Sequence, residues 1–349
     1  MTIEVGILGA TGMVGQQFIA LLAQHPWFKV TWLGASERSA GKAFRDAAAW
    51  RLPTPLANDV ANLKVDEAAQ SAGRAPKLVF SGLDSSVAGE IEGAFAQAGH
   101  VIVSNSRNHR MDPTVPLLIP EVNAEHLSLL DAQGAKYGWQ GRIVTNPNCA
   151  VVVLAMALAP LRQFGLKSAM VTTLQAISGA GYPGVASWDI LANVIPYIGG
   201  GEEEKVETEP KKTLGALSNG AVTPHTVAVS ATTTRVPVHN GHTASVSVGL
   251  EQRPTAEAII DAWRSFSGRP QALNLPSAPP RPLVYLDEPN RPQPALDANR
   301  DGGMTVTVGR LRPCPIQDYK FVALGHNTIR GAAGAAILNA ELMHTEGWL

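Results

Sequence analysis

Apolar and amphipathic segments alternate over the first 145 residues of the chain. Compact apolar runs predict strands, and apolar residues at helical spacing between them predict helices. The strands are expected at 3–10, 29–36, 76–83 and 100–106, and the helices at 13–25 and 88–99. Strands that alternate with helices are typical of a parallel sheet covered on both faces. We therefore expect an α/β domain in this part of the chain.

The pattern changes from about residue 169, where the predicted strands become longer and richer in Thr and Val. They lie at 169–178, 225–238 and 242–251 and indicate a second, α+β domain with a mixed sheet. A stretch dense in proline and charge at 277–299 is expected to be ordered rather than a linker. The last strand, at 320–327, leads into an Ala-rich helix with an apolar stripe.

These segments suggest a division of the chain into two domains. We place the first domain at residues 1–147 and the second at 148–327. The C-terminal helix, 328–349, is expected to pack back on the first domain and complete it. A chain of 349 residues is long for one core and suits two.

Composition narrows the class of protein. The formal charge is -1, and no basic stripe is present, so nucleic acid is not an expected partner. The longest apolar run, 149–161, is too short to span a bilayer, and the first residues already form a predicted strand rather than a signal peptide. Two cysteines in no CxxC pair argue against a disulfide framework and against a zinc site. We expect a soluble, cytoplasmic protein without a metal or a membrane partner.

Three glycines follow the first predicted strand in "GILGATGMVGQQF". Gly9, Gly12 and Gly15 stand where a helix begins, so they permit a tight turn and let backbone N–H groups approach a pyrophosphate. The spacing is GxxGxxG rather than GxGxxG, and the strand before and the helix after support the interpretation. This loop predicts a dinucleotide-binding, Rossmann-type domain.

The end of the second predicted strand, "GASERSAGK", bears on the choice of dinucleotide. Ser36, Arg38 and Ser39 offer two hydroxyls and a guanidinium, which suit the 2′-phosphate of NADP. Glu37 lies between them and is the alternative, as an acidic ligand of the NAD ribose. We favour NADP.

Cys149 stands where the polar turn 146–148 gives way to an apolar run. Free cysteine is often a small core residue, which is the alternative interpretation. At the first turn of a helix, however, the helix dipole lowers the pKa of a thiol. We therefore take Cys149 as a candidate nucleophile that is held ionised. Cys314 lies between two prolines and is interpreted as structural.

A thiol nucleophile needs an acid/base partner, and two histidines near Arg235 qualify. His242 in "RVPVHNGHT" follows a predicted strand and a turn, seven residues after Arg235. His239 lies close to it and competes for the role.

A set of motifs taken together resembles one enzyme family, the aspartate-semialdehyde dehydrogenases. In chain order they are "GATGMVGQ", "GASERSAGK", "SNSRNHRMDPTVPLLIPEVN", "NPNCA", "LQAISGAGYPG", "GEEEKVETEPKK", "RVPVHNGH" and "GHNTIRGAAGA". The resemblance runs from end to end and is greater to the branch shared by archaea and fungi. Residue choices in "NPNCA" and "SNSRNHR" differ from the bacterial forms, although the chemical groups are similar.

The resemblance implies a fold and an activity. The fold is α/β, a Rossmann-type dinucleotide-binding domain plus an α+β catalytic and dimerisation domain with a mixed sheet. The activity is the NADPH-dependent reductive dephosphorylation of L-aspartyl-4-phosphate to L-aspartate-4-semialdehyde, which releases phosphate and leads toward lysine, threonine and methionine. The resemblance also implies a homodimer or homotetramer.

Residue roles follow from the same resemblance. Cys149 would attack the acyl phosphate and form a thioester, with His242 as acid/base, Asn148 holding the phosphate or the oxyanion, and Gln175 orienting the substrate. Substrate binding is assigned to Arg235 for the α-carboxylate, Glu202 for the α-ammonium, and Lys205 with Arg110 for the phosphate. Cofactor contacts are assigned to Gly9, Thr11, Gly12, Met13, Val14, Ser36, Arg38, Ser39, Ser178, Gly179 and Asn327. Glu203, Glu204 and Glu207 of the same motif are interpreted as a solvated helix face.

Three rival functions share part of this pattern. An archaeal-type malonyl-CoA reductase and an N-acetyl-glutamyl-phosphate reductase would use the same Rossmann half, cysteine and thioester chemistry. A catalytically silent NADP-binding regulator is the third. Glu202 and Arg235 favour aspartyl phosphate over the first two.

Overall fold

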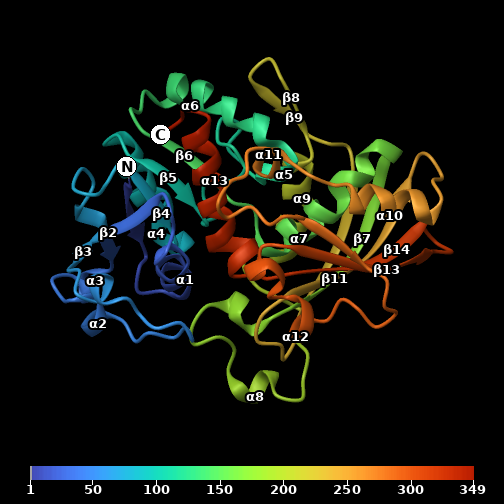
Figure 1. Ribbon diagram of the computed structural model, residues 1–349, viewed down its shortest axis with the longest axis horizontal. Helices are drawn as coiled ribbons and strands as arrows, with labels where there is room; N and C mark the ends of the chain where they lie inside the picture. Colours follow the sequence, from blue (N-terminus) through green and yellow to red (C-terminus); the bar gives the residue numbers. More distant parts are fainter. Residues whose placement is uncertain (1) are drawn as a thin grey trace.

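The structure is a computed structural model that describes residues 2–349 and contains two six-stranded sheets on opposite sides of the molecule (Figure 1). The first sheet is parallel throughout, in the order β3-β2-β1-β4-β5-β6. Its strands are β1 (Ile3–Leu8), β2 (Phe28–Ala35), β3 (Val65–Glu67), β4 (Leu78–Ser81), β5 (Val101–Ser104) and β6 (Arg142–Thr145). The strand order reverses between β1 and β4, which is where open α/β sheets form a binding crevice.

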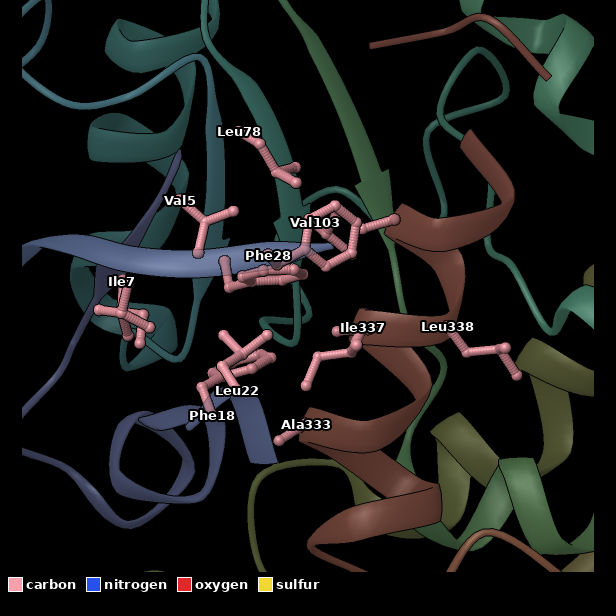
Figure 2. Packing of buried hydrophobic residues seen from close by; sticks show 14 of the residues in the cluster. Val5, Ile7, Phe18, Leu22, Phe28, Leu78, Val103, Ala333, Ile337 and Leu338 are labelled. Carbon is pink, nitrogen blue, oxygen red and sulfur yellow. The ribbon is translucent and has the colours of Figure 1, made fainter. Parts of the chain in front are cut away.

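Helices cover both faces of this sheet. The helices of this half are α1 (Met13–Leu22), α2 (Phe44–Ala47), α3 (Asn58–Ala61), α4 (Ser85–Gln97), α5 (Pro120–Asn123), α6 (Leu129–Tyr137) and α13 (Gly334–Thr345). On one face, Phe28 and Val103 of the sheet pack toward Ile337 of α13, as Figure 2 shows. Phe18 and Leu22 of α1 belong to the same cluster. The C-terminal helix is thus part of the core of the first sheet. The exact division of the chain at residues 147 and 148 stays a prediction.

The second sheet is mixed, in the order β10-β7-β11-β14-β13-β12. Its strands are β7 (Leu166–Gln175), β10 (Ala228–Arg235), β11 (His242–Leu250), β12 (Leu283–Leu286), β13 (Val306–Pro313) and β14 (Tyr319–Gly325), and a separate hairpin is formed by β8 (Ala216–Ser218) and β9 (Ala221–Thr223). The proline-dense stretch 277–299 is ordered, because it contributes the edge strand β12. The expected mixed sheet is confirmed.

One apolar helix is central to the second core. The helices around this sheet are α7 (Cys149–Leu158), α8 (Ser187–Ile190), α9 (Glu202–Thr213), α10 (Ala256–Arg264), α11 (Arg269–Ala272) and α12 (Pro294–Asp297). Every residue of α7 after the first is buried, and the helix packs with Val171, Val246 and Phe321 of the sheet. A helix that is apolar all round must be enclosed by protein, and this enclosure fixes its N-terminal end in place.

A buried ion pair near this end holds the turn that leads into α13. Arg330 donates two hydrogen bonds to Glu121 of α5, at 2.9 and 2.7 Å, and neither side chain is exposed. Arg330 belongs to a π-helical turn, Ile329–Ala333, directly before α13. A buried charge must be paired, so this contact fixes the turn relative to α5.

None of the helices formed by residues 2–349 has both the length and the apolar character that crossing a membrane requires.

A buried carboxyl lies beneath the carboxyl ends of β4 and β5. Glu92 of α4 is fully buried, and its Oε1 accepts a hydrogen bond from Ser104 at 2.7 Å. Its Oε2 lies 3.7 Å from His109 Nε2, and neither atom has a hydrogen-bond partner within residues 2–349. Burial raises the pKa of Glu92 from its ordinary 4.5 to about 7, more than the hydroxyls of Ser81 and Ser104 lower it.

This carboxyl generates a pH-dependent prediction. The folded chain keeps a proton on Glu92 that the unfolded chain has lost, so stability falls as pH rises from 4.5 to about 7. In Glu92→Gln the amide is neutral at every pH and can donate toward Ser81 and His109. We expect the variant to gain up to about 3 kcal/mol over the wild type at pH 8 and nothing at pH 4.5. Urea unfolding at both pH values measures this, and a gain independent of pH would contradict it.

Candidate active site

Three predicted residues meet at one end of the second sheet. Gln175 ends β7 and is paired with Arg235 at the end of β10. His242 begins β11, directly before the pair formed by Thr243 and Leu174 of β7. Because these strands are neighbours, the ends of all three lie together, facing the N-terminal ends of α7 and α9. We take this junction as the candidate active site.

Cys149 is the first residue of α7, as predicted. Asn148 is the N-cap, and its Oδ1 accepts hydrogen bonds from the N–H groups of Ala150, at 2.9 Å, and Val151, at 3.4 Å. Asparagine is a favoured N-cap residue because its short side chain satisfies these otherwise free donors. On the other side, a Cβ added at Gly331 would lie 2.6 Å from the Cβ of Cys149. The cysteine is therefore fixed between its own cap and the π-helical turn.

The expectation that the helix would leave Cys149 ionised is wrong. Part of the residue is exposed, but the sulfur lies among packed protein atoms. Burial, followed by the negative charge of Glu202, raises the pKa of Cys149 to about 12. Arg110, Arg235 and the N–H of Ala150 act in the opposite direction and lower it. The helix N-terminus is present, but burial outweighs it.

His242 is buried and uncharged. Its Nδ1 accepts a hydrogen bond from the N–H of Ala176 at 3.1 Å, so the ring proton resides on Nε2. Burial, then Arg235, lowers the pKa of His242 to about 3. Nε2 is buried without a hydrogen-bond partner in the described chain. A Cβ added at Gly179 would come within 3.0 Å of this atom, so glycine keeps the space in front of it open.

Glu202 begins α9 and connects several predicted residues. Its Oε1 accepts hydrogen bonds from Asn148 Nδ2, at 2.9 Å, and Gln175 Nε2, at 3.2 Å. Its Oε2 pairs with Lys205 Nζ at 3.1 Å, one turn along the same helix. The positive charge of Lys205 and these hydrogen bonds hold the pKa of Glu202 below its ordinary value, despite burial. Glu202 is therefore a buried carboxylate.

Two guanidinium groups complete the cluster. Arg235 is buried and donates to the carbonyl of Ala176 at 2.7 Å. Arg110, in the loop after β5, is buried as well, and its Nε has no hydrogen-bond partner in the described chain. Both positive charges lower the pKa of the Cys149 thiol. The structure thus gathers the thiol of Cys149, the carboxylate of Glu202, the ammonium of Lys205 and two guanidiniums.

The interpretation of the other glutamates as a solvated face is wrong for two of three. Glu203 accepts a hydrogen bond from the N–H of Thr233, and Glu207 accepts one from the N–H of Ala231, each at 3.0 Å. These donors belong to β10, which is an edge strand, so the two carboxylates satisfy backbone groups that the sheet leaves free. Glu204 is exposed, as expected.

Sequence reasoning did not identify Glu209, Lys212 or Gly331. Glu209 and Lys212 continue the stripe of α9 that begins with Glu202 and Lys205. The signal was a charged stripe at helical spacing, but such a stripe is usually solvated, and only packing shows that this one is buried.

The predicted cofactor residues line a cavity of about 890 Å³ at the carboxyl ends of β1 and β2. Its wall contains the cofactor contacts assigned to the glycine loop and to the phosphate, namely Gly9, Thr11, Gly12, Met13, Val14, Ser36, Arg38 and Ser39, whereas Gly15 is not part of it. Gly9 has a φ of +72°, and a Cβ there would lie 2.7 Å from the carbonyl oxygen of Gly82. Lys42, Arg51 and Asp84 also line the cavity, whereas Glu37 is not part of its described wall.

The remaining predicted cofactor residues lie between this cavity and the cluster. Asn327 Nδ2 donates to Ser178 Oγ at 2.8 Å, and its Oδ1 accepts from the N–H of Gly241 at 2.9 Å. Ser178 lines a second cavity of about 640 Å³, which shares Arg51 and Tyr182 with the first.

The two alternative residues lie elsewhere. His239 lines the second cavity and is not among the groups around Cys149. Cys314 lies in the turn between β13 and β14, where its sulfur accepts a hydrogen bond from the N–H of Gln317 at 3.5 Å.

Two family models match the chain. Residues 4–130 match the semialdehyde dehydrogenase NAD binding domain, and residues 158–330 match the semialdehyde dehydrogenase dimerisation domain. Together they cover well over half of the sequence.

Relatives and solved structures agree with these models. The chain is 48% identical to the aspartate-semialdehyde dehydrogenase of Methanothermobacter thermautotrophicus, over 98% of this chain and 99% of that protein. It is 47% identical to the enzyme of Cryptococcus neoformans, over 99% and 98%. The crystal structure of the Candida albicans aspartate semialdehyde dehydrogenase with NADP superposes with a TM-score of 0.91, at 41% identity and full coverage of both chains. Aspartate semialdehyde dehydrogenase II of Vibrio cholerae in complex with ASA gives 0.78, at 25% identity and 99% coverage of each.

Full-length identity at this level, with the same two domain models, shows that the chain belongs to the aspartate-semialdehyde dehydrogenase family.

Proposed function

We propose that this protein is an NADP-dependent aspartate-semialdehyde dehydrogenase that reduces L-aspartyl-4-phosphate to L-aspartate-4-semialdehyde and phosphate. The observation that supports this best is the set of charges around Cys149. The buried carboxylate of Glu202 and the two guanidiniums shift the pKa of the Cys149 thiol in opposite directions. The ammonium of Lys205 lies beside that carboxylate. Names and bound ligands of the relatives agree, since the Candida albicans structure holds NADP and the Vibrio cholerae structure holds ASA.

The charges complement the substrate group by group. Glu202 would bind the α-ammonium, and Arg235, whose planar fork suits a carboxylate, would bind the α-carboxylate. Arg110 and Lys205 would bind the phosphate. A malonyl group has no ammonium, and the nitrogen of an N-acetyl-glutamyl group is not charged, so neither rival substrate would match the carboxylate of Glu202.

Substrate binding would lower the high pKa of Cys149. Glu202 is, after burial, the largest cause that raises it. An ammonium bound to Glu202 would offset that negative charge and favour the thiolate. A nucleophilic thiol of this kind needs a reducing compartment, which favours the cytoplasm.

The first chemical step is an acyl transfer to sulfur. The sulfur of Cys149 forms a bond to the 4-carbonyl carbon, the bond from that carbon to the phosphate oxygen breaks, and a thioester and phosphate result. The thiol loses one proton and the departing phosphate takes up one, so the proton count balances. Arg110 and Lys205 would stabilise the negative charge that builds up on the departing phosphate oxygen as its bond to the carbonyl carbon breaks, before the proton arrives.

His242 would donate a hydrogen bond to the 4-carbonyl oxygen of the substrate. Its Nδ1 is occupied by the N–H of Ala176, so only Nε2–H can face the substrate. In this protonation state His242 is a hydrogen-bond donor, which would stabilise negative charge on the oxygen as the carbonyl carbon becomes tetrahedral. Asn148 and Gln175 would hold Glu202 in place, and with it the substrate.

The hydrogen-bond donors that line the first cavity match the phosphate groups of NADP. Gly9 and Gly12 leave a backbone cradle at the start of α1, where a pyrophosphate binds well. Ser36, Arg38 and Ser39 line the wall where the adenosine phosphate would lie, and Glu37 is not part of that wall. Ser178, Gly179 and Asn327 would lie along the nicotinamide half. When bound, NADPH supplies the hydride that reduces the thioester carbon.

The proposal extends to self-association through the second sheet. One face packs on α7, while the other exposes Met170 and Leu174 of β7, at 50% and 40%. The nearby segment 182–197 exposes Trp188 at 93%. Apolar residues gathered in this way mark an interaction surface, and the matched dimerisation domain supports a second copy of the chain as the partner. We propose a homodimer, or a homotetramer built from it.

Replacing the nucleophile tests the proposed reaction. Purified wild type is expected to form NADPH from aspartate semialdehyde and NADP only when phosphate is added, followed by absorbance. In Cys149→Ser we expect kcat to fall at least about a thousandfold, because the hydroxyl is far less nucleophilic than the thiol. Cys314→Ser is the matched control and should keep wild-type activity. A Cys149→Ser variant with a tenth of the wild-type rate would refute the assignment.

A charge on the exposed sheet face tests the proposed dimer. Met170→Lys is expected to shift the protein to a monomer, because an ammonium at the centre of an apolar interface loses its hydration. Light scattering after gel filtration gives the mass in solution. Ile316→Lys, in the turn between β13 and β14 and 85% exposed, is the control and should leave the mass unchanged. If the wild type is itself a monomer at micromolar concentration, this part of the proposal fails.

A further inference from the structure

Glu209 of α9 has contacts that the proposed reaction does not yet explain. It is only 2% exposed and lies seven residues after Glu202, which places both on the same face of the helix. Its Oε1 accepts a hydrogen bond from Arg110 Nη1 at 2.9 Å. Its Oε2 accepts one from the backbone N–H of Asn148 at 2.6 Å. One buried carboxylate therefore joins two segments of the site.

One of these segments would bind the leaving group of the proposed acyl transfer, and the other contains the nucleophile. Arg110 belongs to the loop after β5 and would bind the phosphate that leaves. Asn148 belongs to the loop after β6, and the next residue is the nucleophile, Cys149. These loops are about forty residues apart in the sequence. In the structure, Glu209 is bonded to both.

A second side chain of α9 fixes the same loop. Lys212, one turn after Glu209, donates hydrogen bonds to the carbonyls of Arg110, Asp112 and Val115, at 2.7, 2.6 and 2.8 Å. Arg110 also donates through Nη2 to the carbonyl of Asn105 at 2.7 Å. The backbone of this loop is therefore held by Lys212, which leaves Glu209 to set the direction of the guanidinium.

We propose that Glu209 is a positioning residue that fixes the phosphate-binding guanidinium of Arg110 relative to the turn that carries Cys149. This inference rests on the proposed function. Because the phosphate leaves from the carbon that the sulfur attacks, both groups must be placed within a fraction of an ångström. With Nη1 bound to Glu209 and Nη2 to Asn105, the unpaired Nε of Arg110 remains as a donor for the phosphate.

The chemistry of the two contacts explains why a carboxylate is needed. Both partners are donors, so the residue must present an acceptor to each. Glutamine has one carbonyl oxygen, which can still accept from the N–H of Asn148, but its amino group would then face the guanidinium. Glu209→Gln therefore breaks the contact with Arg110 and can keep the contact with Asn148.

Steady-state kinetics of the phosphate-dependent oxidation of aspartate semialdehyde test the proposal. For Glu209→Gln we expect KM for phosphate to rise at least about tenfold, with KM for aspartate semialdehyde within twofold of the wild type. Glu204→Gln, an exposed glutamate on the same helix, is the matched control and should leave both values unchanged. A merely structural role would lower the melting temperature and kcat without a selective change in KM for phosphate, and that result would overturn the proposal.

A double-mutant cycle separates a specific contact from a general effect. Arg110→Lys is expected to raise KM for phosphate on its own, and adding Glu209→Gln should then have little further effect, because the contact is already lost. Independent, multiplying effects would contradict the proposal. If Glu209→Gln does not fold, Glu209→Asp decides, since it keeps the charge but cannot reach both partners. It should raise KM for phosphate in the same selective way.

These measurements also separate a failure of the proposed function from a failure of the role proposed for Glu209. A wild-type protein that shows no phosphate-dependent reaction refutes the proposed function. A wild type that turns over normally, together with an unchanged KM for phosphate in Glu209→Gln and Glu209→Asp, refutes only the role of Glu209.

Discussion

The cap of helix α7 is the constraint on which the rest of the site depends. Asn148 uses each of its polar groups at the helix start: Oδ1 accepts from Ala150, Nδ2 donates to Glu202, the backbone N–H donates to Glu209, and the carbonyl accepts from Val152. The helix behind it is enclosed by the second core and cannot move without disturbing that packing. The sulfur at the first position of the helix therefore has a fixed place, and the polar groups around it can be aimed at one substrate.

Neighbouring groups shift the pKa of the Cys149 thiol in opposite directions. Burial and Glu202 raise the pKa of Cys149, whereas Arg110 and Arg235 lower it. The neighbouring His242 is kept neutral by burial and by Arg235. Thiol and imidazole are thus both uncharged at neutral pH, while the groups that would bind substrate are charged. We infer that such a site would react slowly with general electrophiles and would be activated by a substrate with the complementary charges.

Local signals in the sequence predicted those parts of the structure that depend on neighbours along the chain. The start of α7 at Cys149 follows from the change from a polar turn to an apolar run, and the glycine loop follows from the strand before it. The strands β3 and β6 were not predicted, because β3 (VDE) contains two acidic residues and β6 (RIVT) has an apolar run of only Ile143 and Val144. The edge strand β12 was hidden in a proline-dense stretch. The pKa of Cys149 was predicted in the wrong direction, because the sequence shows the helix start but not the burial that outweighs it. Glu209 was missed for a similar reason, since a buried charged face and a solvated one have the same spacing.

The proposed reaction requires Cys149 to form a covalent bond to the acyl group during turnover. The most direct measurement is mass spectrometry of protein that is mixed with aspartate semialdehyde and NADP in the absence of phosphate and then quenched in acid. We expect the tryptic peptide 143–162, which contains this cysteine, to gain the mass of one aspartyl group, and phosphate added before the quench to remove that mass. An unmodified peptide in protein that turns over when phosphate is present, or the added mass on another residue, would contradict the account.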